Sequence, residues 1–430
     1  MPSGDQLLER YRQRLLPVFN PVLALARGQG AVVWDADGGE YLDLLGGIAV
    51  NALGHAHPAW VEAISRQAAK LGHISNLYAS EPQLELAGKL LEITGAGPGG
   101  RVFLTNSGAE ANEAALKAVL RRQGGRHRLL ALEGSFHGRT LGALSLTAKP
   151  AYRTPFAEFT GPAEFLAPGD VAALEAQLAP GDVAALVLEV IQGEAGVIPL
   201  PPGYLAEARR LTRQYGALLW IDEVQAGIGR TGAWMAYLNP ELGGPLRDGE
   251  PAASLRNEAD PAAALAEATG RGGARVGPAP DLVTLAKGLG GGFPIGAMVA
   301  MNATAAGLLQ AGDHGNTFGG GPLASAAALA TLSAIENEGL IGHAAELGAW
   351  WRRELAKVDG VKAARGTGLL IGIVLEEPDA AAVVKAAQAA GFLVGATGPE
   401  VLRLAPPLIL TKDQAERFAT ALPDLIKEAA

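Results

Sequence analysis

The chain has 430 residues, of which 49% are hydrophobic, and a formal net charge of -9 at pH 7. This length exceeds what one hydrophobic core usually organises, so we expect a large domain with smaller segments beside it. The acidic balance argues against a nucleic-acid partner, and 0 cysteines exclude disulfides, thiolate metal sites and a catalytic thiol.

The N-terminal segment MPSGDQLLERYRQRLLP predicts a short amphipathic helix over residues 5–16 that ends before Pro17. It carries acids among its arginines and has no long apolar core, so it is not typical of a signal peptide. No apolar run approaches the length of a membrane span. We therefore expect a cytoplasmic protein without a membrane partner. The histidines lack an H-E-x-x-H pair, so we expect no metal site.

The run AVVWDADGGEYLDLL alternates on either side of Asp37-Gly38-Gly39 and predicts a β-hairpin. Helices are predicted near residues 58–71 and 81–94. They flank the loop HISNLYAS, whose polar and aromatic composition suits either a substrate rim or an ordinary surface loop. We assign residues 1–57 to an N-terminal arm and hairpin that form part of a small domain.

From Arg101 onward, short apolar β runs alternate with helical stretches, which predicts an open, mostly parallel α/β sheet. Ligands on such sheets bind at the carboxyl ends of the strands, so the residues that follow each strand are the candidates. The predicted strands are RVFLT, RLLALEG, VAALVLEVI, ALLWIDEV, DLVTLA and IGAMVAM.

The first strand is followed by Asn106-Ser107-Gly108-Ala109 and then by a strong helix pattern. Backbone N–H groups at a helix start suit a phosphate, although an ordinary Ser-Gly cap is an equal alternative. After the second strand, Phe136 could stack on a planar ring and Arg139 could bind a carboxylate. His137 is interpreted as structural, because a lone histidine more often is.

Carboxylates follow the next two strands, at Gln192-Gly193-Glu194 and at Asp222-Glu223. A carboxylate at a buried strand end is costly unless it meets a cation or hydrogen-bond donors. A protonated pyridine nitrogen would satisfy Asp222, and the carboxylate would keep that nitrogen charged.

Lys287 ends the run DLVTLA and precedes a cluster of glycines. Desolvation at a buried strand end lowers a lysine pKa, and a neutral amine forms Schiff bases with carbonyl compounds. The alternative is a lysine that merely extends from the strand into solvent. The glycines follow the lysine rather than precede it, so they do not form a Walker loop.

Residues 239–278 are rich in Gly, Ala, Pro and both charges, and we interpret them as a surface insertion with a short helix near 260–268. Residues 336–430 are assigned to a smaller C-terminal domain. They comprise helical stretches and then a βαβ-like tail with the strands GLLIGIVLE, GFLVGA and VLRLAPP. Arg403 lies among apolar residues of the last strand, where an unpaired guanidinium would be expensive.

Taken in order, a set of motifs resembles the class III, fold-type I pyridoxal-phosphate (PLP) aminotransferases, and within that class the acetylornithine aminotransferases. The motifs are NSGAEANEAALK, SFHGRT, EVIQGEAGV, IDEVQAGIGRTG, PDLVTLAKGLGGGFPIG, HGNTFGG and LRLAPPL. The resemblance implies an α/β fold, with a large PLP-binding domain over residues 58–335. It also implies a smaller α+β domain built from the C-terminal and N-terminal segments.

The resemblance implies that Lys287 forms the Schiff base with PLP and that Asp222 binds the pyridine nitrogen. It implies a homodimer with shared active sites, because the family's counterpart of Thr317 reaches the phosphate of the neighbouring subunit. The other cofactor-binding residues implied are Ser107, Gly108, Ala109, Phe136, Val224 and Gln225.

For the substrate, the resemblance assigns Arg139 to a carboxylate and Arg403 and Glu194 to a switching ion pair. Asn316 stands where the family has a substrate-contacting serine. Gly321 and Val190 also depart from the family pattern, at positions that the chemistry does not need.

The expected reaction moves the terminal amino group of N2-acetylornithine to 2-oxoglutarate, as in arginine biosynthesis. Alternatives are a related aminotransferase for ornithine, 4-aminobutyrate, succinyl-diaminopimelate or a carrier-bound lysine. An aminomutase or racemase on the same fold would not need both Arg139 and Arg403. A non-catalytic cofactor-binding module would not need Lys287 and Asp222.

Overall fold

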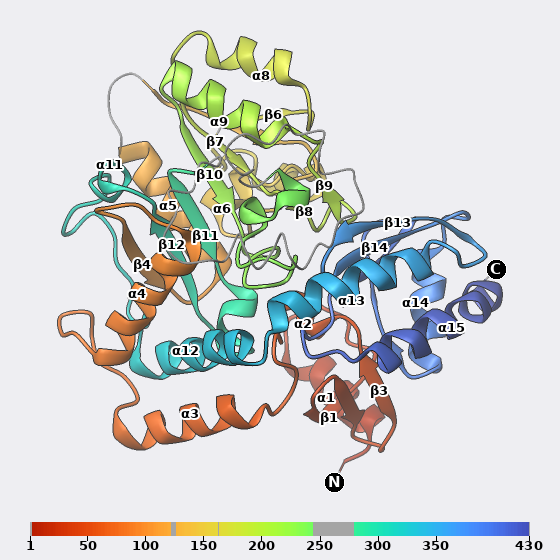
Figure 1. The fold of residues 1–430 in the computed structure, drawn as a ribbon. Coiled ribbons are helices and arrows are strands. Elements are labelled where there is room, and N and C mark those ends of the chain that lie inside the picture. The colour runs from red at the N-terminus through yellow and green to blue at the C-terminus, as the bar shows by residue number, and fades with distance from the viewer. Residues whose placement is uncertain (1, 122–125, 162, 244–278, 430) are drawn as a thin grey trace.

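The structure is a computed structural model that describes residues 2–121, 126–161, 163–243 and 279–429. Figure 1 shows a large unit around a twisted sheet and a smaller unit that contains both ends of the chain. Most of the predicted insertion, including the helix expected near 260–268, lies outside the described residues.

The large unit is built on a seven-stranded sheet with the order β4-β12-β11-β10-β7-β5-β6. Neighbouring strands are parallel except at β12, which runs antiparallel to β11 and β4. The prediction of a mostly parallel open sheet is therefore confirmed. The strands are β4 (Arg101–Thr105), β5 (Arg128–Leu132), β6 (Ala163–Leu166), β7 (Val183–Leu188), β10 (Leu218–Asp222), β11 (Leu282–Leu285) and β12 (Gly296–Ala300).

Strand β6 was not predicted, because its sequence AEFL is short and only its last residue is buried. It pairs with β5 at the edge of the sheet. The central strands β7 and β10 are buried along their whole length, which explains why they lack a polar face.

Alternate residues of each strand face opposite layers of helices. Trp220 of β10 belongs to the core cluster that includes helix α5 (Gly108–Arg121), whereas Leu219 and Ile221 belong to the other cluster. Asp222, two residues beyond Trp220, therefore lies on the α5 side of the sheet. This alternation brings a strand-end carboxylate and a helix together.

The helices predicted near residues 58–71 and 81–94 are α3 (Pro58–Lys70) and α4 (Glu81–Thr94), and both pack on α12 (Pro322–Asn337). The predicted N-terminal helix is α1 (Gly4–Arg14). The other helices of eight or more residues are α8 (Val171–Leu178), α9 (Tyr204–Tyr215), α13 (Leu340–Leu355), α14 (Ala380–Ala389) and α15 (Lys412–Ala429).

The smaller unit contains a sheet of order β13-β14-β17-β16. Neighbouring strands are antiparallel, so β14 and β16, which are connected through α14, run in the same direction on either side of β17, as the predicted βαβ-like tail requires. The unpredicted β13 forms a hairpin with β14 across Gly368, whose φ of 58° suits a tight turn. The strands are β13 (Val361–Thr367), β14 (Leu370–Leu375), β16 (Gly395–Ala396) and β17 (Val401–Leu404).

The N-terminal hairpin lies beside the C-terminal segment, as Figure 1 shows. Strands β2 (Val32–Asp35) and β3 (Glu40–Asp43) form the predicted hairpin, and β1 (Leu25–Gln29) pairs with β2. The C-terminal strand β15 (Phe392–Leu393) joins β3 in parallel. The two ends of the chain thus share one sheet.

The remaining elements are short. No helix among the described residues is both long and apolar enough to cross a bilayer. These elements are α2 (Gly46–Ala49), α6 (Leu141–Ser145), α7 (Pro150–Arg153), α11 (Ala303–Ala306), β8 (Ile191–Gln192), β9 (Ile198–Pro199), η1 (Thr154–Phe156), η2 (Ala236–Leu238), η3 (Pro240–Leu242) and η5 (Lys287–Gly290).

Candidate active site

A cavity of about 440 Å³ lies at the carboxyl ends of β4, β10 and β11. The fold brings most of the predicted site residues to its wall, from segments far apart in the sequence. The predicted residues that line it are Ser107, Gly108, Ala109, Phe136, Arg139, Asp222, Val224, Gln225 and Lys287. Residues without a predicted role that line it include Asn106, Asn112, His137, Glu189, Phe293 and Pro294.

Lys287 lies two residues beyond the end of β11 and begins the short helix η5. Burial, together with the nearby positive charge of Arg403, lowers the pKa of its amine to about 8. Its backbone has a φ of 45°, a left-handed conformation that is unfavourable for a residue with a Cβ. The local geometry thus holds a readily deprotonated amine at the cavity wall.

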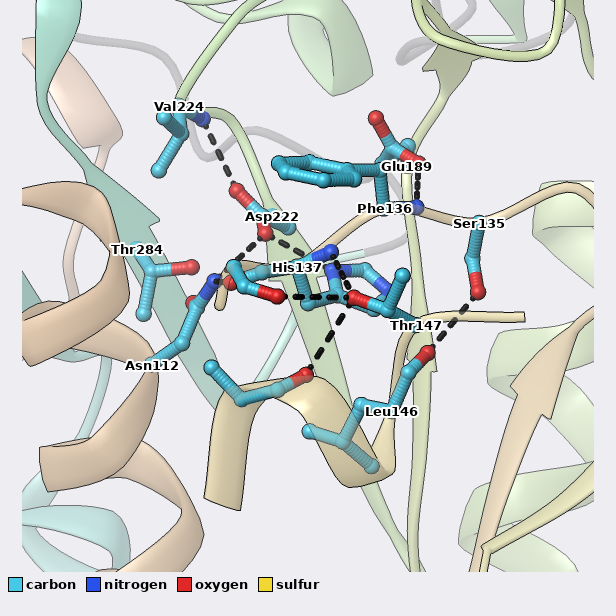
Figure 2. Close-up of polar contacts among 12 residues, drawn as sticks. Asn112, Ser135, Phe136, His137, Leu146, Thr147, Glu189, Asp222, Val224 and Thr284 are labelled. Carbon is cyan, nitrogen blue, oxygen red and sulfur yellow. Dashed lines mark hydrogen bonds and ion pairs between the residues drawn. The ribbon is translucent and has the colours of Figure 1, made fainter. Parts of the chain in front are cut away.

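The carboxylate of Asp222 is buried and hydrogen bonded at both oxygens (Figure 2). Its Oδ2 accepts a bond of 2.8 Å from Nδ2 of Asn112 and lies 2.7 Å from Nδ1 of His137. Its Oδ1 accepts a bond of 3.0 Å from the backbone N–H of Val224. These donors fix the orientation of a carboxylate that would otherwise be expensive to bury.

His137 has a role that the sequence analysis missed. Burial would lower its pKa, but the contact with Asp222 outweighs burial and the pKa is raised. The backbone N–H of His137 donates to Oγ1 of Thr147 at 2.9 Å, which holds the histidine loop against α6. The signal available in the sequence was that His137, like Asp222, follows a buried strand of the same sheet.

Asn112 and Glu189 were also missed. Asn112 is a buried polar residue in the Ala-rich helix α5, and its Nδ2 also donates to the carbonyl of His137 at 2.6 Å. Glu189 follows β7, and its Oε2 accepts the backbone N–H of Phe136 at 3.1 Å. Burial raises the pKa of Glu189 to about 7. Asp222 was singled out because it is a carboxylate at the end of a buried strand, and the same reasoning applies to Glu189.

The start of α5 forms another part of the cavity wall. Oγ of Ser107 accepts the backbone N–H of Glu110 at 3.2 Å, so the serine caps the helix. Gly108 has no side chain, and a Cβ built there would lie 2.8 Å from Cγ1 of Val224. The cavity therefore remains open beside the helix N-terminus, where free N–H groups favour an anion.

Arg403 and Glu194 form an ion pair from β17 and from the segment after β8. Arg403 is buried, and its guanidinium also lies 3.4 Å from Oε1 of Gln225 at the cavity wall. Burial acts to raise the pKa of Glu194, but the charge and hydrogen bond of Arg403 outweigh it, so the pKa is lowered. The charged form of Glu194 is therefore favoured beside Arg403.

Arg139 reaches the cavity wall as an exposed guanidinium. It forms no ion pair within the described parts of the chain, so it is available to a ligand carboxylate. The side chain of Asn316, unlike that of Arg139, is occupied by contacts within the chain. Its Oδ1 accepts a hydrogen bond from the backbone N–H of Gly319 at 2.7 Å, and its Nδ2 donates to the carbonyl of Leu104 at 3.0 Å. Thr317 is exposed and does not line the cavity of its own chain.

Comparison with known proteins places this geometry in a family. The model of "Aminotransferase class-III" matches residues 17–243 and 268–426. The acetylornithine aminotransferase of Streptomyces coelicolor is 47% identical over 431 residues, covering 100% of this chain and 97% of that protein. The acetylornithine aminotransferase of Mycobacterium leprae is 48% identical over 94% of this chain and 91% of its own length.

Solved structures agree with the sequence relatives. An ornithine aminotransferase from Toxoplasma gondii, with PLP partially occupying its active site, superposes with a TM-score of 0.84 at 30% identity. That match covers 99% of this chain and 95% of the other. The N-acetylornithine aminotransferase of Stenotrophomonas maltophilia gives a TM-score of 0.76 at 33% identity over 98% of both chains. The chain belongs to the class-III aminotransferases.

Proposed function

We propose that this enzyme transfers the terminal amino group of N2-acetyl-L-ornithine to 2-oxoglutarate, giving N-acetylglutamate 5-semialdehyde and L-glutamate in arginine biosynthesis. The observation that carries the proposal is the pairing of Arg403 with Glu194, together with an Arg139 that lines the cavity and forms no ion pair within the described ranges. A site with one covered and one open guanidinium suits two substrates with different carboxylate patterns. The curated relatives at 43–48% identity are acetylornithine aminotransferases.

PLP is the cofactor of the class, and the residues present fit it. The open N-terminus of α5 suits the phosphate, and Phe136 and Val224 flank a cavity wide enough for a flat ring. Asp222 supplies a buried carboxylate for a pyridinium nitrogen, and the amine of Lys287 would hold the cofactor covalently. When bound, PLP supplies a carbonyl that accepts amines and a ring that stabilises negative charge on the adjacent carbon.

The residues of the chain position the groups around that ring. The His137–Asp222 contact holds the carboxylate in place at the cavity wall, where it can hold a proton on a pyridine nitrogen. Because the pKa of Lys287 is only about 8, its amine can release and accept a proton near neutral pH. We therefore assign to Lys287 the movement of a proton at the carbon that bears the amine.

Recognition of both substrates follows from the two guanidinium groups. While Glu194 covers Arg403, the acylated donor places its carboxylate on Arg139 and its terminal amine near Lys287. When Glu194 turns away, Arg403 is free to bind the α-carboxylate of 2-oxoglutarate, and Arg139 binds the distal one. Glu194 is suited to this movement because its side chain is 34% exposed, whereas that of Arg403 is 5% exposed.

We also propose a homodimer with shared active sites. Thr317 and Phe318 lie exposed on a loop after α11, and Leu77 and Tyr78 form an exposed apolar rim. Exposed apolar side chains of this kind mark protein contacts. In the dimer, the hydroxyl of Thr317 would reach the cofactor phosphate of the partner, which explains why it does not line its own cavity.

The test is a panel of amino donors offered to the purified holoenzyme. Loss of the cofactor absorbance at the first step, followed by glutamate formation from 2-oxoglutarate, should be most efficient with N2-acetylornithine. Ornithine, 4-aminobutyrate, succinyl-diaminopimelate and a carrier-bound lysine serve as comparison donors. A higher kcat/KM for any of these would replace the proposed donor.

A further inference from the structure

An aromatic ring with two cations close to it lies next to Phe136 and Arg139 of the cavity wall. Cζ of Arg139 lies 3.3 Å from the ring centroid of Tyr152, and Nζ of Lys149 lies 4.8 Å from the same centroid. Nζ of Lys149 also donates to Oη of Tyr152 at 3.4 Å. The ring meets Phe136 edge to face, with centroids 6.4 Å apart, so the group is continuous with the cavity wall.

Neither cation has a carboxylate partner among the residues that the structure describes. Within the described ranges, Arg139 and Lys149 form no ion pair. By contrast, Arg209 pairs with Asp281. Like charges close together repel, and the negative face of an aromatic ring offsets this repulsion only partly. An anion bound between them would offset the rest.

Lys149 also influences the substrate side of the site. Burial acts to raise the pKa of Glu194, and Arg403, Lys287 and Lys149 act in the opposite direction. The charge of Lys149 therefore acts in the same direction as that of Arg403 on the switching carboxylate, although Lys149 itself is exposed.

We propose that Lys149 is a second carboxylate-binding cation of the active site, and that Tyr152 positions both Lys149 and Arg139 for the same carboxylate. The inference rests on the proposed function, because it assigns the α-carboxylate of the acylated donor, and the distal carboxylate of 2-oxoglutarate, to this pair. Arg139 alone can hold a carboxylate in a fork, and Lys149 adds a point charge beside it.

Tyr152 acts here through its ring. The guanidinium of Arg139 is exposed and long, and without the ring its many rotamers would rarely place it over the cavity. Stacking at 3.3 Å restricts those rotamers before the substrate arrives. The expected result of losing the ring is weaker substrate binding, with little change in the chemical step.

The experiment measures binding and turnover of the holoenzyme variants Lys149→Met, Tyr152→Leu and Tyr152→Phe. Lys149→Met should raise KM for acetylornithine and for 2-oxoglutarate about fivefold and leave kcat within about twofold, as expected for a partly exposed charge pair. Tyr152→Leu should raise both KM values about five- to tenfold. Tyr152→Phe retains the ring and should stay within about twofold of wild type.

Two controls make the result specific to a carboxylate. N-acetylputrescine is acetylornithine without its carboxylate, so Lys149→Met should leave its kcat/KM unchanged. Lys357→Met removes a lysine that pairs with Glu354 outside the site and should change no KM value. N-acetylnorvaline, which lacks the reacting amine, should bind Lys149→Met about fivefold more weakly in calorimetry.

The outcomes separate this inference from the proposed function. Equal KM values for acetylornithine in wild type and Lys149→Met would overturn the role of Lys149, and transamination would stand. A similar loss with N-acetylputrescine and with acetylornithine would show a structural effect and would also overturn it. Failure of the wild type to use acetylornithine would instead overturn the proposed function.

Discussion

Nδ1 of His137 lies 2.7 Å from Oδ2 of Asp222, and both side chains are buried beneath the cavity. The contact joins the loop after β5 to the end of β10. Because Asn112 of α5 binds the same oxygen, the carboxylate cannot rotate without losing hydrogen bonds. We propose that the pair sets the charge that the cavity presents to the pyridine ring of PLP.

For Asp222→Asn we expect turnover to fall by about 10²- to 10³-fold, the range for losing one preorganised electrostatic contact. Cofactor affinity should fall much less, because a neutral amide removes charge but retains size. For His137→Phe we expect a smaller fall, about tenfold, because Asn112 and the N–H of Val224 remain. Single-turnover spectra and cofactor titration of the two variants give both quantities, and an unchanged turnover in Asp222→Asn would reject this role.

Lys287→Ala should still bind PLP but should lack a link that borohydride can reduce, because the other cavity residues remain. Mass spectrometry of the reduced, digested protein measures the link directly. Lys149→Ala is the matched control, since it removes another lysine near the site and should retain the modified peptide. A reduced adduct in Lys287→Ala would assign the link to a different lysine.

The rate of covalent PLP capture by the apoprotein should depend on pH through Lys287. Only the neutral amine reacts, and burial lowers its pKa from 10.5 to about 8. The rate should therefore rise about tenfold per pH unit below this value and level off above it. Stopped-flow absorbance between pH 6 and 10 measures the profile, and a rate that still rises steeply above pH 9 would indicate an unshifted lysine.

Arg403→Ala should cripple the half-reactions with glutamate and 2-oxoglutarate and spare the one with acetylornithine. Truncating a buried arginine–carboxylate contact costs about 3–5 kcal/mol, or about 10²- to 10³-fold. Arg139→Ala should damage both half-reactions, and Glu194→Ala should improve glutamate relative to acetylornithine, since Arg403 stays uncovered. Rapid-kinetic spectra of each half-reaction decide the matter, and equal losses for both donors in Arg403→Ala would exclude the switch.

Removal of residues 244–267 should leave activity within about threefold of wild type, which corresponds to a change of roughly 0.65 kcal/mol in activation free energy. The family model matches the chain on both sides of this segment and not within it. The segment is rich in Gly, Ala and Pro, which contribute little to a core. Replacement by a short Gly-Ser linker, followed by steady-state kinetics and gel filtration, tests this, and abolished activity would show that the segment is required for the site or the dimer.

Local sequence patterns determined the sheet, the helices and the strand-end positions of Lys287 and Asp222. Short apolar runs that alternate with helical patterns indicate strands buried on both sides, and ligands bind such sheets at the carboxyl ends of the strands. The same patterns failed for β6 and β13, whose polar and partly exposed residues do not differ from loops. They did not show that β17 inserts between β14 and β16 of the tail, because a pattern of strands does not specify which edges will pair.

Only the tertiary structure decided which side chains meet. His137 and Asp222 are 85 positions apart in the sequence, and Glu194 and Arg403 are 209 apart. Whether His137 was structural or functional depended on the order of strands, which places the ends of β5 and β10 on either side of β7. Local propensity carries no information about such long-range neighbours. The stacking of Tyr152 on Arg139 likewise depends on the packing of helix α7 against the loop after β5. Side-chain packing decides this contact, and no sequence spacing predicts it.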